Sequence, residues 1–283
     1  MNRRKFLVNT SAAIAIAGIV SFEQPASSQP GIEQPASSKP SIDAYCTLGV
    51  DREYKLTDAQ LLAAMDQAGV EMAIIAPPDR FLAVYNRQGN AEIHRAAASH
   101  SRRFIPACSV NPWFGKAAIN ELRRALGEGA RMLVVHPAVQ GFLANDELLF
   151  PIIEEAAQAK VPVYIHTGQP GNSTPWQIVD LAGKYPEADF ILGHCGATDF
   201  WNDMPGALNA VPNLYCEASL SRPFRFAEYV KAVGSRKCIM GSWAPLSDLV
   251  FEWEEMRKYL PRQDQPDCLG NNMYTLLQKR GAL

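Results

Sequence analysis

Three histidines stand at the ends of short apolar, β-rich runs, where side chains that do chemistry often lie. His136 follows RMLVV, His166 ends VPVYIH and His194 ends DFILGH. A neutral imidazole binds divalent metals, and near pH 7 it also accepts or donates protons. Glu217, in NLYCEA, adds a carboxylate of the kind used in acid–base catalysis. The pattern predicts His166, His194 and Glu217 as catalytic residues, and His136 as either a substrate-binding or a hydrogen-bonded structural residue.

Four further side chains are expected at the same site. Tyr45 lies at the end of SIDAYC, while Ser242 and Trp243 follow KCIMG. Trp243 either stacks on a substrate or fills the cavity. Arg222, with Arg225 close by in SRPFRF, either clamps a substrate carboxylate or forms a salt bridge on a helix surface.

These residues need a scaffold that gathers the ends of several strands. Eight β-like runs alternate with amphipathic segments such as TDAQLLAAMDQAG, in which Leu61, Leu62, Met65 and Ala68 share a face and Thr57 or Asp58 offers a cap. The runs span 41–46, 71–76, 103–109, 131–135, 161–166, 189–194, 213–218 and 237–241. The pattern predicts an α/β protein, a single-domain (β/α)8 TIM barrel, with its site at the C-terminal ends of the strands. An open sheet with fewer strands and a small cap is the alternative.

The composition restricts the classes of molecule that the protein is expected to bind. The 283 residues include 27 basic and 29 acidic ones, with no basic stripe beyond the first few residues. We therefore expect a small-molecule substrate and no nucleic-acid partner. The sequence also allows a homo-oligomer. Of the six cysteines, Cys46, Cys108, Cys216 and Cys238 lie inside β-like runs, which favours buried free thiols over structural disulfides.

The first 40 residues are expected to lie outside the barrel, which we place at 41–283. Residues 1–22 predict an export signal, in which RRKFL resembles the twin-arginine motif, and they imply transient contact with that export machinery and a periplasmic location. The apolar run from Ala12 to Val20 is too short for an integral membrane anchor. Residues 23–40 repeat a Pro- and Ser-rich decapeptide, which is typical of a linker.

Seven segments resemble, in order, the landmarks of the amidohydrolase-related family. They are IDAYCTLG, RMLVVHPAVQGF, VPVYIHTGQPG, FILGHCG, NLYCEASL, IMGSWAP and LGNNMYTLL. This branch of the amidohydrolase superfamily includes metal-dependent hydrolases and non-oxidative decarboxylases. The resemblance implies a His-x-His on strand 1, a His on each of strands 5 and 6, and an Asp on strand 8, grouped around divalent metal. His166 and His194 match this pattern.

The remaining metal ligands of the pattern are missing. Tyr45, Cys46 and Thr47 stand in place of His-x-His, and Trp243 stands in place of the Asp. A catalytic zinc site normally has three protein ligands, so two histidines do not complete one. Cys46 or Cys195 would add a thiolate and Glu217 a carboxylate if they pointed inward, but alternation along the strands turns both cysteines away from Tyr45 and His194. No cofactor is favoured; His166 and His194 are the ligands if one zinc or manganese ion is retained.

Two functions follow from these observations. The first is a hydrolase, or a non-oxidative decarboxylase, of a small organic substrate, with a degenerate metal site centred on His166 and His194. Its pocket is lined by His136, His166, His194 and Glu217. The second is a catalytically inactive barrel that binds a small ligand or a partner protein, with Trp243 and Tyr45 filling the cavity. The fold alone does not distinguish these two functions.

Overall fold

The computed structural model describes residues 39–197 and 199–281, and within them eight parallel strands form one sheet in chain order. Each predicted strand is present, with its ends shifted by at most two residues. The strands are β1 (Ile42–Thr47), β4 (Met72–Ala76), β5 (Phe104–Ser109), β6 (Met132–Val135), β7 (Val163–His166), β8 (Phe190–Gly193), β9 (Leu214–Glu217) and β10 (Cys238–Ile239). A short hairpin of β2 (Gly49–Val50) and β3 (Lys55–Leu56), which the sequence did not predict, follows β1.

Hydrogen bonds between the first and last strands close the sheet. The amide of Ala44 donates to the carbonyl of Met240 at 3.0 Å, that of Trp243 to Tyr45 at 2.8 Å and that of Thr47 to Ala244 at 2.7 Å. With both edges joined, the predicted (β/α)8 barrel is confirmed and the open-sheet alternative is excluded.

A helix follows each barrel strand and packs on its outer side. These helices are α1 (Asp58–Ala68), α3 (Asn86–Ser99), α4 (Lys116–Gly127), α6 (Phe150–Gln158), α7 (Pro175–Lys184), α8 (Met204–Ala210), α9 (Pro223–Val233) and α10 (Leu249–Tyr259). Shorter helices α2 (Asp79–Ala83) and α5 (Pro137–Gln140) lie in the loops after β4 and β6. Of the two caps that the sequence allowed, Thr57 caps α1, through a capping box with Gln60.

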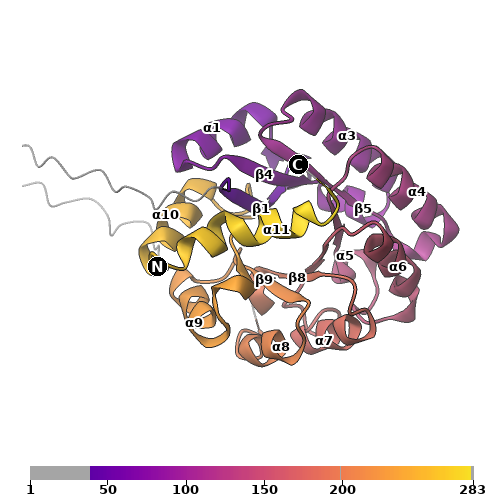
Figure 1. Ribbon diagram of the computed structural model, residues 1–283. Helices are drawn as coiled ribbons and strands as arrows, with labels where there is room; N and C mark the ends of the chain where they lie inside the picture. Colours follow the sequence, from indigo (N-terminus) through magenta and orange to yellow (C-terminus); the bar gives the residue numbers. More distant parts are fainter. Residues whose placement is uncertain (1–38, 198, 282–283) are drawn as a thin grey trace, which may run out of the picture. The chain divides into compact units, whose positions relative to one another are not determined.

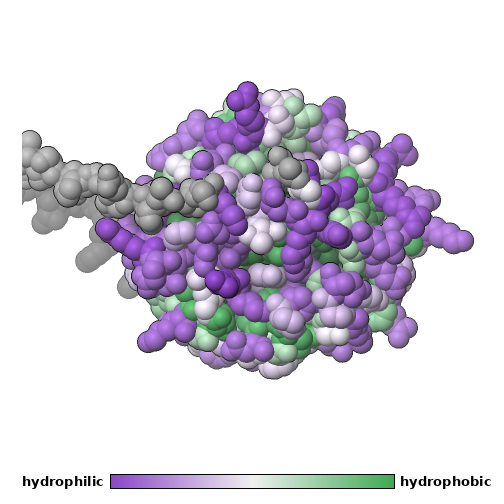
Figure 2. Space-filling view, viewed as in Figure 1, coloured by the Kyte–Doolittle hydropathy of each residue, from purple (hydrophilic) through white to green (hydrophobic). Residues whose placement is uncertain are grey.

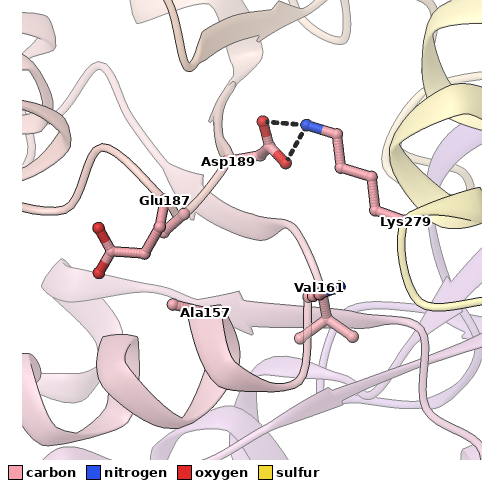
Figure 3. A pocket seen from close by; sticks show the side chains of 7 residues that line it. Ala157, Val161, Glu187, Asp189 and Lys279 are labelled. Carbon is pink, nitrogen blue, oxygen red and sulfur yellow. Dashed lines mark hydrogen bonds and ion pairs between the residues drawn. The ribbon is translucent and has the colours of Figure 1, made fainter.

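One apolar core lies between strands and helices, and a second fills the barrel interior. Helix α11 (Asn272–Gln278) lies across one end of the barrel (Figure 1) and adds Met273, Leu276 and Leu277 to the inner core. Its end is fixed by Lys279, whose ammonium group donates to both carboxylate oxygens of Asp189, just before β8 (Figure 3). Helix α11 therefore closes the N-terminal end and leaves the opposite end for a site.

The surface around α11 is mostly hydrophilic, with small hydrophobic areas between charged side chains (Figure 2). Each of the six cysteines is a buried free thiol, as expected. Within the described ranges, no helix is both long and apolar enough to cross a membrane. The predicted export signal at 1–22 and nearly all of the predicted linker at 23–40 lie outside the described residues.

Candidate active site

Alternation along the strands brings the candidate residues into the C-terminal end of the barrel. Residues two apart on a strand face the same side, so Tyr164 accompanies His166 on β7 and Ser219 accompanies Glu217 at the end of β9. Strand β1 breaks this rule, because a bulge between Asp43 and Cys46 inserts one extra residue opposite β4. Ala44 and Tyr45 both join the inner core, while Cys46 joins the outer one.

Six side chains form one buried hydrogen-bonded chain, which we call the histidine chain. The Tyr45 hydroxyl is 2.9 Å from Nε2 of His166, and Nδ1 of His166 is 2.8 Å from Nε2 of His194. Nδ1 of His194 is 2.6 Å from the hydroxyl of Ser219, which lies 2.8 Å from Oε2 of Glu217. The Tyr164 hydroxyl donates to the same carboxylate oxygen at 2.7 Å.

The ionised form of Glu217 determines which atom donates in each hydrogen bond of the histidine chain. A carboxylate only accepts hydrogen bonds, so the Ser219 hydroxyl donates to Glu217 and accepts a hydrogen bond from Nδ1 of His194. Nε2 of His194 must then accept from Nδ1 of His166, whose Nε2 accepts from the Tyr45 hydroxyl. Both imidazoles are thus neutral, with the proton on Nδ1, and four transfers connect Tyr45 to Glu217.

Aromatic stacking surrounds the histidine chain. His136 stacks on His166 with ring centroids 4.1 Å apart, and Trp243 stacks on His194 at the same distance. Tyr45 stacks on Tyr164 at 4.5 Å. The three histidines are each at most 4% exposed, whereas Trp243 is only partly buried and forms the outer cover of His194.

Burial in this apolar end shifts the ionisation of its groups. Loss of solvation lowers the pKa of His136 to about 4 and that of His194 to about 3, and it lowers the pKa of His166 well below its ordinary value. Burial also raises the pKa of Glu217 to about 7, against four hydrogen bonds that favour its charged form. The imidazoles are therefore neutral, and Glu217 exchanges a proton near neutral pH.

The backbone is strained where it presents these side chains. His194 and Cys195 have consecutive positive φ angles of 67° and 49°, and Leu220 and Trp243 have φ of 59° and 56°. Non-glycine residues rarely adopt this left-handed conformation, and it concentrates at functional sites. These four residues follow β8, β9 or β10, beside the histidine chain, whereas a fifth, Lys160, lies before β7.

Asp43, which the sequence analysis missed, holds Tyr45 and Ser242 in place. Its carboxylate is fully buried on the outer side of β1, and Oδ1 accepts from the amides of Tyr45 and Ser242 at 3.2 and 3.0 Å. Oδ2 accepts from Nε1 of Trp253 on α10 at 2.8 Å. Asp43 thus fixes β1 to the loop after β10. An acidic residue inside an apolar strand run was the available signal for it.

We expect Trp253→Phe to destabilise the barrel by about 1–3 kcal/mol, because it leaves a buried carboxylate oxygen of Asp43 without its donor. Urea unfolding of the full chain measures the change. Trp176→Phe is the control, since Trp176 is 50% exposed, and it should alter stability by less than about 0.5 kcal/mol. Equal effects of the two substitutions would contradict the role given to Asp43.

Three further predicted site residues have other surroundings than the open pocket. The Ser242 hydroxyl is buried and accepts from the amide of Ala244 at 3.1 Å, so it stabilises its own loop. Glu217 is fully buried at the inner end of the histidine chain. Arg222 lines a separate hollow with Cys195 and Trp201 on the outer side of β8 and β9.

The donor set does not fit a divalent metal of the kind that the resemblance implies. The facing nitrogens of His166 and His194 are joined by a shared proton at 2.8 Å. In the part of the chain that the structure describes, no cluster of three or more His, Cys, Asp or Glu side chains is arranged to hold a metal ion. Trp243, which stands where the resemblance implies the strand 8 Asp, stacks on the His194 ring and supplies no metal ligand.

Comparisons with known proteins agree with this architecture. A family model described as amidohydrolase matches residues 47–277, whereas no curated protein matches the sequence. An uncharacterised TIM-barrel protein of Bordetella bronchiseptica superposes with a TM-score of 0.72 at 17% identity, covering 86% of this chain and 99% of the other.

Two decarboxylase structures resemble this chain about as much as the Bordetella protein does. A 5-carboxyvanillate decarboxylase of Novosphingobium aromaticivorans, complexed with manganese and a nitrobenzoic acid, gives a TM-score of 0.72 at 14% identity and covers 86% and 97% of the two chains. A 2,6-dihydroxybenzoate decarboxylase of Rhizobium gives 0.70 at 14% identity, covering 86% and 100%. At such identities the likeness shows the fold alone.

Proposed function

This chain belongs to the amidohydrolase family, and from that premise we propose that it is a hydrolase, or a non-oxidative decarboxylase, of a small organic substrate. The family that seven sequence segments indicated is confirmed. In this proposal acid–base chemistry of the histidine chain replaces the metal chemistry of the family. Export to the periplasm through residues 1–22 stays a prediction from the sequence.

The observation that carries the proposal is the continuous chain from Tyr45 to Glu217. A reaction that adds water to a carbonyl, or a proton to a ring carbon, needs a group that takes or supplies one proton. The chain links the Tyr45 hydroxyl to a carboxyl group whose pKa lies at about 7, so a proton is stored and returned at neutral pH.

His136 supplies a second function in this proposal. Its Nδ1 accepts from the amide of Val139 at 3.4 Å, so the neutral ring carries its proton on Nε2. That N–H is suited to donate to a carbonyl or carboxylate oxygen of a substrate.

The rim of the barrel end favours an apolar or aromatic substrate. Large hydrophobic side chains are exposed in the loops after six strands, or at the start of the helices that follow them. They include Tyr85, Trp113, Trp176, Trp201, Phe224 and Leu246. Such side chains bind a substrate by burying its apolar area, while few polar groups orient it.

Ser219→Ala tests the proposal, because it interrupts the histidine chain and removes no histidine. We expect it to lower kcat at least about 100-fold on whichever ester, amide or hydroxybenzoate of a small aromatic panel the wild type converts. Ser109→Ala is the control, since it removes a buried hydroxyl that has no hydrogen-bond partner among the described residues. Full activity of Ser219→Ala would contradict the proposal.

Metal content is measured on the same preparations, purified without chelators. We expect no stoichiometric zinc or manganese in the wild type. Stoichiometric metal that is lost in His166→Ala or His194→Ala would contradict the metal-free part of the proposal and leave the hydrolase or decarboxylase activity to a metal site.

One observation favours the second function, a catalytically inactive barrel that binds a ligand or a partner protein. Trp243 stacks on His194, and every nitrogen of His166 and His194 is already hydrogen-bonded. If Trp243 fills the former metal cavity permanently, the wild type converts no member of the panel and Trp243→Ala, which opens the cavity, gives no activity either.

A further inference from the structure

The hollow beside Arg222 is a second feature of the barrel end, separate from the histidine chain. It encloses about 430 Å³ between the loops after β8 and β9 and the first turns of α9. Cys195, Leu220 and Ser221 lie in its wall, but none of the residues of the histidine chain does. Cys195 belongs to the outer apolar core, so the backbone of the strained turn at His194 and Cys195 separates the two sites.

Arg222 provides the charge of this hollow. It is exposed, and within the described residues its guanidinium makes no hydrogen bond or ion pair. Arg225, one turn along, is already occupied: it donates to Glu228 at 2.6 Å and lies over the Trp201 ring at 4.0 Å. The clamp of two arginines that the sequence allowed is therefore reduced to Arg222, while Arg225 forms the surface salt bridge.

The walls around Arg222 are aromatic and apolar. Trp201, Phe224 and Leu220 are partly exposed on them, and Tyr229 is fixed by donating its hydroxyl to the carbonyl of Trp201 at 3.0 Å. Ser221 adds a hydroxyl beside Arg222. A planar apolar body with one carboxylate matches these groups, because a guanidinium holds a carboxylate with two parallel hydrogen bonds while aromatic walls bury the ring.

We propose that this hollow is a binding site for a small aromatic carboxylate, held by Arg222. The site does not depend on the function proposed above, since none of its lining residues belongs to the histidine chain. It does adjoin that chain, because Cys195 follows His194 and Leu220 follows Ser219 in the sequence. A bound ligand therefore lies against Cys195 and Leu220, both of which have positive φ angles.

Isothermal titration of the full chain with benzoate tests this inference. We expect saturable one-to-one binding to the wild type and a loss of at least about tenfold in affinity in Arg222→Ala, because a charge-assisted hydrogen-bonded pair is removed. Benzamide, of the same shape but without charge, should bind at least about tenfold more weakly to the wild type. Arg236→Ala, which removes an exposed arginine just beyond the opposite end of α9 from Arg222, is the matched control and should bind benzoate normally.

The histidine variants separate this inference from the proposed function. Benzoate binding should persist in His166→Ala and in Ser219→Ala, whether or not these variants lose turnover. Equal affinity of Arg222→Ala and the wild type overturns the inference, as does the absence of saturable benzoate binding. Binding that is lost in His166→Ala but retained in Arg222→Ala would place the ligand at the histidine chain and overturn it as well.

Discussion

We expect the barrel to lose stability steeply as the pH falls from about 6.5 toward 4. Burial lowers the pKa of His136 to about 4, that of His194 to about 3, and that of His166 well below its ordinary 6.5. The unfolded chain therefore binds protons in this range that the folded chain does not. Each such histidine lowers the free energy of unfolding by up to about 1.4 kcal/mol per pH unit.

Glu217 changes the free energy of unfolding with pH in the opposite direction to the histidines. Burial raises its pKa to about 7, so its contribution to stability is fully present below pH 4.5 and is lost as the pH rises through 7. Between pH 4.5 and 6.5 it offsets one of the three histidines. Asp79, whose pKa burial raises to about 6, offsets a second histidine over much of this range, and burial also raises the pKa of Asp43. The net slope is therefore at most about 1–3 kcal/mol per pH unit. Stability is therefore expected to be highest near or above pH 7.

Urea unfolding between pH 7.5 and 4.5 measures this slope. His136→Gln should reduce the slope by up to about 1.4 kcal/mol per pH unit. A slope that is the same in His136→Gln and in the wild type is incompatible with a neutral buried imidazole at this position.

Gly193→Ala is expected to be the most damaging small substitution at the site. A Cβ atom at Gly193 would lie within 3.0 Å of the ring and hydroxyl oxygen of Tyr164, closer than real Cβ contacts come. Tyr164 must then leave the position from which it donates to Glu217 and stacks on Tyr45. Overpacking and the lost charged hydrogen bond together predict about 3–5 kcal/mol of destabilisation.

Thermal unfolding measures the effect, with an expected decrease in Tm of about 10 °C or more. Gly127→Ala is the matched control, because the same added methyl group meets nothing within 4 Å at the end of α4. That variant should keep or slightly raise the Tm. If Gly193→Ala behaves like Gly127→Ala, then Tyr164 does not hold Glu217 in the way described.

The sequence predicted the barrel well because strand formation depends on local apolar patterning, and each of the eight runs carries enough β-branched and apolar residues to mark it. It also placed His166 and His194 at adjoining strand ends. Tyr45, the partner of His166, was also expected at the site, whereas Ser219, the partner of His194, and Tyr164, the partner of Glu217, were not. Tyr164 and Ser219 share a strand face with His166 and Glu217, and that spacing was the available signal.

Other features of the site depend on contacts between distant strands. The bulge in β1 changes which residues face inward, and strict alternation does not reveal it. Gly193 and Gly241 are required because the side chains of Tyr164 and Glu217 occupy the space beside them. Such requirements come from the closed barrel as a whole, so they cannot be inferred from any one segment.

The closing helix has a consequence for the order in which the chain folds during synthesis. Helix α11 completes the inner core with residues 273–277, and β1 finds its second neighbour only in the segment at 240–244. A nascent chain that is still attached to the ribosome therefore keeps both edges of its growing sheet unpaired until the segment at 240–244 has been synthesised. Such edges pair readily with other chains, so slow translation or early termination exposes this protein to aggregation before its barrel can close.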